Sequence, residues 1–272
     1  MRIAIIGGGV MGELIARSLL DRNILNEEQL VIAEISPYRR EELGKKYKFL
    51  VVSDAVYAAH GADLVILCVK PQSAAETMTA LKGKIKPSAL VISIMAGVAL
   101  KTLQEGLSHK TVVRSMPNIA SRIGMGMTVW MADEDIPDLE LLLAKVVFQS
   151  FGRELRVDSD DLLDAATAVS GTGPAYIFYV AEKLIESSRS LGFSLEQSKW
   201  LVNQTFLGAM EMWERTKEEP EKLRLMVTSK KGTTEAAIKR FEELKTGEVF
   251  KEAVGAAYRR AKELGEEVSR LK

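Results

Sequence analysis

The stretch GGGVMG at residues 7–12 decides the fold of the N-terminal part of this chain. An apolar run at residues 2–6 comes directly before it and predicts a β-strand. A helical pattern follows over residues 13–21. The spacing G-x-G-x-x-G, placed between a strand and a helix, is typical of a turn that binds a dinucleotide. The sequence therefore predicts such a turn at the start of the chain.

Each of the three glycines of this G-x-G-x-x-G spacing has its own physical role in that prediction. Gly7 permits the tight turn, Gly9 lets the backbone approach a pyrophosphate, and Gly12 lets the helix pack closely on the strand. The helix that opens at Val10 and Met11 would direct unpaired N–H groups and its positive end toward the anion.

Strand-like and helical patterns alternate along the chain to about residue 158. A helical pattern lies at residues 37–46, and further strand-like runs lie at residues 30–35, 49–52, 64–69, 90–94, 111–116 and 126–130. Strands separated by helices favour parallel pairing through right-handed crossovers. Residues 1–158 are therefore predicted to form a Rossmann-like domain, an α/β fold with a doubly wound sheet.

After residue 158 the strand signal stops, and residues 159–272 are predicted to form an all-helical domain. Its large apolar side chains recur at helical spacing and predict a core or a subunit interface; they include Trp200, Phe206, Leu207, Met210 and Trp213. A helical region of this length has a limited core of its own, so we expect it to bury helices against a second subunit.

Composition excludes several classes of protein. The 272 residues carry a formal net charge of zero, which gives no support for a nucleic-acid or membrane-surface partner. The single cysteine, Cys68, cannot form an intrachain disulfide, and with only two histidines no metal site is expected. No signal peptide and no apolar run long enough to span a membrane is recognised, so a cytoplasmic location is expected.

The end of the second predicted strand bears on the choice of cofactor. Glu34 lies 22 residues after Gly12 and is placed to bind the ribose hydroxyls of NAD. Ser36, Arg39 and Arg40 follow at once and could instead receive the 2′-phosphate of NADP. The sequence leaves NADH and NADPH open.

Six segments give the chain a resemblance to the pyrroline-5-carboxylate reductase family. The turn at residues 7–12 has the family's form G-x-G-x-M-G. The remaining five are VKPQ at residues 69–72, SIMAGV at 93–98, RSMPN at 114–118, AVSGTGPAY at 168–176, and VTS followed by GTT at 227–234. These matches run in the family's order along nearly the whole chain.

The resemblance implies NADPH- or NADH-dependent reduction of 1-pyrroline-5-carboxylate to L-proline, the last step of proline biosynthesis. It also implies a homodimer, which in many members assembles further into a ring of five dimers. The nicotinamide cofactor would supply the hydride, and the protein would supply position and electrostatics. A cyclic imine is basic enough to arrive protonated near neutral pH, so no strong catalytic acid is required.

The resemblance also assigns residues to the site. On the cofactor side it implies Gly7, Gly9, Val10, Met11, Gly12, Glu34, Ser36, Val69, Lys70, Pro71, Ala96 and Gly97. On the substrate side it implies Asp160, Ser170, Gly171, Thr172, Gly173, Gly232, Thr233 and Thr234. The hydroxyl of Thr234 is the candidate catalytic group that would hydrogen-bond the imine nitrogen. Both substrate segments are expected to open helices, whose N–H groups would bind the carboxylate.

Three departures from the family pattern keep other functions open. Ile119-Ala120 replaces Thr-Pro, Lys230-Lys231 replaces Pro-Gly, and Ala55 stands where an asparagine is common. A sibling imine reductase, a β-hydroxyacid-type dehydrogenase with a different substrate, and a non-catalytic dinucleotide-binding protein are the alternatives. Assays with both substrate classes, and cofactor binding without turnover, would discriminate them.

Overall fold

The computed structural model describes residues 1–270 as 12 α-helices, eight strands and four short 3-10 or π-helical turns. The strands are β1 (Ile3–Ile6), β2 (Leu30–Ala33), β3 (Leu50–Val52), β4 (Leu64–Leu67), β5 (Leu90–Ser93), β6 (Val112–Met116), β7 (Gly126–Ala132) and β8 (Gly152–Arg156). Within the described residues, no helix is both long enough and apolar enough to cross a membrane.

Seven helices follow or separate these strands. They are α1 (Val10–Asp21), α2 (Pro37–Lys46), α3 (Ala55–Ala59), α4 (Ala74–Leu81), α5 (Leu100–Leu107), α6 (Asp138–Gln149) and α7 (Asp160–Ala166). The short turns are η1 (Glu27–Gln29), η2 (Pro71–Ser73), η3 (Ile119–Ile123) and the π-helical η4 (Thr167–Gly171). The remaining helices are α8 (Gly173–Ser190), α9 (Leu195–Thr216), α10 (Pro220–Met226), α11 (Thr233–Glu243) and α12 (Thr246–Arg270).

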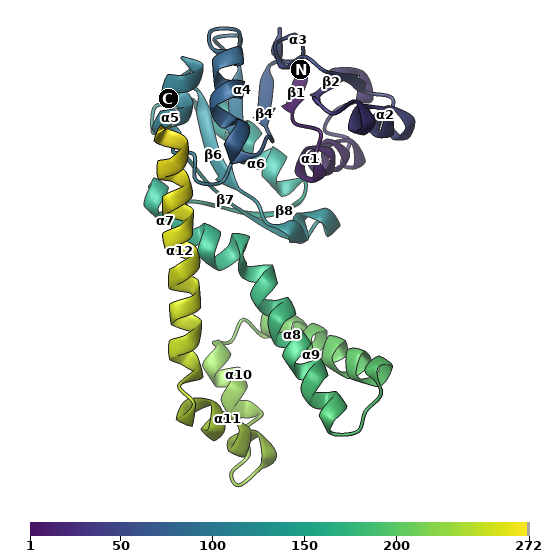
Figure 1. The fold of residues 1–272 in the computed structure, drawn as a ribbon, viewed down its shortest axis with the longest axis vertical. Coiled ribbons are helices and arrows are strands. Elements are labelled where there is room, and N and C mark those ends of the chain that lie inside the picture. Colours follow the sequence, from purple (N-terminus) through teal and green to yellow (C-terminus); the bar gives the residue numbers. More distant parts are fainter. Residues whose placement is uncertain (271–272) are drawn as a thin grey trace. The chain divides into compact units, whose positions relative to one another are not determined.

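The strands form one sheet in the order β3-β2-β1-β4-β5-β6-β7-β8, seen in the upper part of Figure 1. The first six strands in this order, from β3 at the edge to β6, pair in parallel. The chain adds strands in one direction from β1 to β3 and in the other direction from β4 onward, so the switch point lies between β1 and β4. In open α/β sheets, ligands bind beyond the carboxyl ends of the strands at such a switch point. The predicted Rossmann-like class is confirmed.

Helices cover both faces of the sheet, because its central strands are apolar on both sides. Ile3 and Ile5 of β1 join a core with α1, α2 and α6, whereas Ala4 and Ile6 join a second core with α3, α4 and α5. All four side chains are buried, as expected for strands of a parallel sheet covered on both faces. Cys68, directly after β4, is partly exposed as a residue, but its thiol lies inside the protein and this burial raises the pKa of the thiol.

The far edge of the sheet differs from the prediction in two ways. Strand β7 runs antiparallel to β6, and β8, which the sequence did not reveal, pairs parallel with β7. The residues of β8 read GRELR and are mostly half-buried or exposed, so they lack the apolar run by which the inner strands were recognised. An edge strand with charged side chains is common, because charges discourage further strand pairing.

The chain divides into two compact units. The first holds residues 1–172 and 257–272, and the second holds residues 173–256. In the second unit α8 packs against α9, which begins with a capping box of Ser194 and Gln197. This unit consists of helices only, and the last part of α12 belongs to the first unit. Residues 159–172, which were predicted to belong to the helical domain, therefore lie in the unit that holds the sheet.

Candidate functional site

The glycine-rich turn after β1 has the tight geometry that its sequence predicts. A Cβ on Gly12 would lie 2.0 Å from the Gly7 carbonyl oxygen, and one on Gly7 would lie 2.8 Å from the backbone of Cys68. Gly7 also adopts a φ of +106°, which favours glycine. These glycines let β1, α1 and the end of β4 come together at the switch point.

Gly9 shows that the turn fits a dinucleotide. A Cβ there would meet no atom within 4 Å, so the backbone faces open space at the start of α1. Gly9 accepts the N–H of Glu13, which starts the helical bonding and leaves the N–H groups of the first turn directed outward. A pyrophosphate could approach those groups without meeting a side chain at Gly9.

Glu34, at the end of β2, is held by the backbone of the same turn. One carboxylate oxygen accepts the N–H of Gly8 at 2.9 Å, and the other accepts the N–H of Ser36 at 2.8 Å. The hydroxyl of Ser36 accepts the N–H of Arg39 at 3.4 Å and caps α2, with Pro37 at its first position. Glu34 and Ser36 therefore lie beside the glycine turn, as the cofactor prediction requires.

The ends of β4 and β5 hold the other predicted cofactor residues. Val69 is half-buried, Lys70 is exposed, and Pro71 begins η2. Ala96 and Gly97 follow β5, and Gly97 is buried with a φ of +75°. A Cβ on Gly97 would lie 2.8 Å from the backbone nitrogen of Gly265 in α12, so close packing on that helix also requires glycine here.

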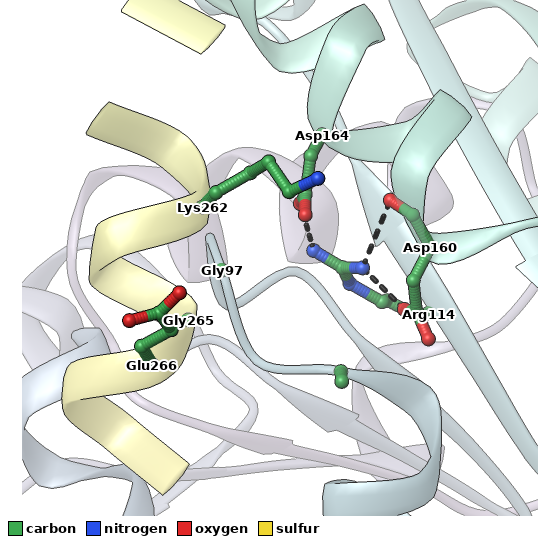
Figure 2. Close-up of a pocket in the computed structure, with 8 residues that line it drawn as sticks. Gly97, Arg114, Asp160, Asp164, Lys262, Gly265 and Glu266 are labelled. Carbon is green, nitrogen blue, oxygen red and sulfur yellow. Dashed lines mark hydrogen bonds and ion pairs between the residues drawn. The ribbon is translucent and has the colours of Figure 1, made fainter. Parts of the chain in front are cut away.

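A cavity of about 400 Å³ lies in the first unit beside Gly97. Its lining comes from the loop after β5, from β6, from α7 and from the last turns of α12, and Figure 2 shows Lys262 and Glu266 on α12 facing this space. Most of its charged groups are paired within the protein. Lys262, for example, donates to Asp161 at 2.7 Å.

Arg114 of β6 is the most deeply buried charge of this cavity, with a side chain only 1% exposed. Its guanidinium donates to Asp160 and to Asp164, both on α7 (Figure 2). Asp160 also accepts the N–H of Leu100, at the start of α5. The carboxylate predicted near the substrate is thus engaged in joining α7 to β6 and α5.

A helix, α8, does begin at Gly173 as expected, but Ser170-Gly171-Thr172 do not form a free helix start. They lie in or directly after the π-helical turn η4, which continues α7 toward α8. The N–H and the hydroxyl of Thr172 both donate to the Thr167 carbonyl, at 2.8 and 3.0 Å. The wide π turn bonds Thr172 internally, so its donors are not directed at a ligand.

Asn118 positions this π turn, a role that the sequence did not reveal. Its amide nitrogen lies 3.3 Å from the carbonyl and the hydroxyl of Ser170, and its amide oxygen accepts the N–H of Met127. Asn118 therefore connects β7 to Ser170. Its place in the RSMPN segment was the available signal, but only the fold shows which atoms it joins.

In the second unit, Gly232, Thr233 and Thr234 do open a helix, α11, as predicted. Gly232 is the N-cap, and its carbonyl accepts the N–H of Ala236. Thr233 is exposed and Thr234 half-buried. The N–H groups of this first turn lack partners within the helix and can bind an anion.

The two lysines that depart from the family pattern lie just before this helix. Lys231 adopts a φ of +58°, the left-handed region that favours glycine. Its N–H donates to the Glu235 carboxylate at 2.7 Å, which helps to hold this backbone shape. A lysine therefore occupies the conformation that the family's glycine would adopt without strain.

The described residues thus place the predicted cofactor residues together at the switch point of the first unit. The substrate residues are divided, since Asp160 and residues 170–172 belong to the first unit and Gly173 and residues 232–234 to the second. No cluster of three or more potential metal ligands is present among the described residues.

The fold and the glycine turn define a Rossmann-type dinucleotide-binding protein with a second, helical unit. Residues 2–97 match the family "NADP oxidoreductase coenzyme F420-dependent", and residues 160–264 match the family "Pyrroline-5-carboxylate reductase dimerisation". A pyrroline-5-carboxylate reductase of Synechocystis is 36% identical over 265 residues, which cover 97% of this chain and 98% of the relative. The chain belongs to the pyrroline-5-carboxylate reductase family.

Solved structures of this family agree with that assignment. A pyrroline-5-carboxylate reductase from Coxiella burnetii has a TM-score of 0.89 and 34% identity, covering 97% of this chain and 98% of its own. The Plasmodium falciparum pyrroline carboxylate reductase, solved with NADP bound, has a TM-score of 0.87 and 27% identity with the same coverage. The recognition made from sequence motifs is confirmed.

Proposed function

We propose that this protein reduces 1-pyrroline-5-carboxylate to L-proline with NADH or NADPH, the last step of proline biosynthesis. The observation that carries the proposal is the open, glycine-lined turn at the switch point of a chain that matches this family over 97% of its length. When bound, a reduced nicotinamide supplies a hydride to the imine carbon. The imine nitrogen gains or keeps one proton, so that C=N becomes CH–NH.

On the cofactor side, the chain's residues would bind and orient. The first-turn N–H groups of α1, at Val10 and Met11, would hold the pyrophosphate. The backbone at Val69–Pro71 and the small residues Ala96 and Gly97, at the ends of β4 and β5, would border the nicotinamide side. Residues 1–158 would then serve as the dinucleotide-binding domain.

On the substrate side, two segments would hold the cyclic imino acid. The N–H groups at the start of α11 (Gly232, Thr233 and Thr234) would bind its carboxylate, and the Thr234 hydroxyl would hydrogen-bond the imine nitrogen. Ser170, positioned by Asn118, would add a hydroxyl, with Gly171, Thr172 and Gly173 shaping the backbone around it. Asp160 would act on this site through Arg114 rather than by touching the substrate.

Residues 159–272 would serve substrate binding and dimerisation. Large apolar side chains of the second unit are exposed in the single chain, among them Trp200 at 77% and Leu207 at 58%. A helical unit with exposed residues of this size fits burial against a second copy. We propose a homodimer that can assemble into a ring of five dimers, in the cytoplasm.

The decisive experiment follows the oxidation of NADH and NADPH by absorbance with synthetic 1-pyrroline-5-carboxylate. Proline formation should accompany it, whereas a β-hydroxyacid with NAD⁺ or NADP⁺ should give no turnover. Turnover only with the hydroxyacid would replace the proposal by the dehydrogenase alternative. Cofactor binding with no turnover on any cyclic imine would favour the non-catalytic alternative.

Thr234→Ala tests the proposed catalytic hydroxyl. We expect kcat/KM for the imine to fall by a factor that corresponds to the loss of about 1–3 kcal/mol of transition-state stabilisation. This is the cost of removing one partner from a buried polar contact. Thr246→Ala, at the start of α12, removes a hydroxyl from another helix start and should leave the kinetics unchanged. Wild-type kinetics in Thr234→Ala would remove Thr234 from the mechanism.

A further inference from the structure

We infer that Glu34, together with the ion pairs that hold Arg39, makes this protein select NADH over NADPH. The inference rests on the proposed function only in that a nicotinamide dinucleotide binds at the glycine turn. It concerns a specificity-determining side chain, and the sequence alone left this choice open.

The Glu34 carboxylate is fixed at the turn by two backbone donors. Gly8 and Ser36 donate their N–H groups at 2.9 and 2.8 Å, one to each oxygen. A carboxylate has about four acceptor sites, so each oxygen can still accept one hydroxyl. The two neighbouring hydroxyls of an adenosine ribose would satisfy those positions.

The Glu34 side chain also lies close to the backbone of the turn. A Cβ on Gly8 would lie 3.1 Å from the Glu34 Cβ and 2.8 Å from a methyl carbon of Leu43. Position 8 is a variable position of the fingerprint, and the absence of a side chain at Gly8 lets Glu34 lie directly against the turn. A 2′-phosphate would therefore meet a fixed negative charge, and like charges in contact are strongly unfavourable.

Arg39, the first candidate receptor for a 2′-phosphate, is already bound within the protein. Its Nε donates to the Gly8 carbonyl at 2.8 Å, and its terminal nitrogens pair with Glu13 and with Glu42. Its side chain is only 19% exposed. Receiving a phosphate would require breaking contacts that hold α1 and α2 together.

Glu13 remains charged under all physiological conditions, so it keeps Arg39 neutralised. Burial alone would raise the pKa of Glu13, but hydrogen bonds from Lys46, Arg39 and Tyr47 outweigh this effect and lower the pKa to about 2. Lys46 also donates to Glu13. The positive charges of Arg39 and Lys46 on α2 are therefore balanced by the Glu13 and Glu42 carboxylates.

Arg40, the second candidate, points its guanidinium at backbone. One terminal nitrogen donates to the carbonyls of Glu34 and Ile35, at 2.9 and 2.8 Å. These bonds stabilise the loop that carries Glu34 and engage that nitrogen with the backbone. A family structure holds NADP, so the fold itself accepts the 2′-phosphate, and the discrimination here comes from the side chains of this turn.

The experiment measures cofactor binding without any imine present, by titration calorimetry of the wild-type protein with NADH and with NADPH. We expect NADH to bind at least about tenfold more tightly, since like-charge contact costs more than this factor. Adenosine 5′-monophosphate should likewise displace NADH better than adenosine 2′,5′-bisphosphate. Equal or tighter binding of NADPH by the wild type would overturn the inference.

Substitutions of Glu34 test whether this side chain determines the preference for NADH. Glu34→Gln removes the charge with little change of shape, and the NADH/NADPH affinity ratio should fall at least about tenfold. Glu34→Asp keeps the charge and should retain preference for NADH. Glu41→Gln, an exposed carboxylate on the neighbouring helix α2, is the matched control and should leave the ratio unchanged. An unchanged ratio in Glu34→Gln would also overturn the inference.

The outcomes separate this inference from the proposed function. NADH selectivity in binding without reduction of 1-pyrroline-5-carboxylate would refute the activity and support the role of Glu34. Proline formation with NADPH preferred over NADH would refute the role of Glu34 and support the activity. The calorimetric readout depends on neither the imine nor the proposed catalytic residues.

Discussion

The two compact units differ in where their apolar side chains lie. In the first unit Ile3, Ile5 and Trp130 are 0% exposed, because helices cover both faces of the sheet. In the second unit Trp200 and Leu207 remain exposed at 77% and 58%. The first unit therefore buries its core within one chain, whereas the second exposes large apolar side chains of a kind that often mark an interface.

This difference suggests that the stability and function of the two units depend on a partner subunit to different degrees. A self-contained sheet can hold a fixed cofactor turn in a single chain. The helical unit, by contrast, gains much of its stability from association, so its part of the substrate site would be complete only in the assembly. Substitutions in the two units should therefore act through different observables.

The largest effect is expected from charges on the apolar surface of α9. Trp200→Glu combined with Leu207→Glu places two carboxylates one heptad apart on one side of this helix. Burying them at an interface is unfavourable, so the variant should be monomeric and should lose more than about 99% of its imine reduction. Light scattering after size exclusion and the kinetic assay measure both effects.

The matched control is Leu139→Glu in the first unit, where Leu139 is 74% exposed on α6. It adds a charge to an exposed apolar position without touching α9, and it should leave the oligomer and the activity intact. A dimeric and active double variant would contradict the idea that the second unit depends on a partner through α9.

A smaller effect, measured on stability, is expected from Arg114→Met. This substitution leaves Asp160 and Asp164 without their buried cation, and the free energy of unfolding should fall by about 3–5 kcal/mol. Urea unfolding measures it. The control Arg240→Met breaks an exposed pair with Glu243 in the second unit and should change stability little. Equal losses in both variants would show that burial does not distinguish the two pairs.

The sequence predicted the parts of the first unit that local pattern determines. The apolar runs gave β1, β2, β4 and β5 within two residues, and the glycine spacing gave the cofactor turn. Strand β8 was missed because its charged edge residues carry no apolar pattern. The antiparallel direction of β7 was missed because pairing direction depends on tertiary contacts.

The candidate site was harder to predict, because several of its residues have roles that only long-range contacts create. Glu34 was recognised from its spacing, but its bond to Gly8 appears only in the fold. Asp160 was placed near the substrate, yet its partner Arg114 lies 46 residues away in sequence. The start of α8 was predicted from Gly173 and Pro174, but the π turn that holds Ser170 just before it was not.

The smallest of the expected effects is pH-dependent and belongs to the first unit alone. Glu13→Gln removes the carboxylate that binds Arg39, Lys46 and Tyr47, and at pH 7 it should cost about 1–2 kcal/mol of unfolding free energy. The folded pKa of Glu13 is about 2, below the ordinary 4.5, so its stabilisation is complete above pH 4.5 and disappears as the pH falls toward 2.

The gap between wild type and Glu13→Gln should therefore narrow as the pH falls from 5 toward 2, which urea unfolding at several pH values measures. Lys46→Met, which leaves Arg39 and Tyr47 as donors, should show a smaller gap with the same direction of change. A gap that stays constant over this pH range would mean that the Glu13 charge contributes nothing to the free energy of unfolding of the first unit.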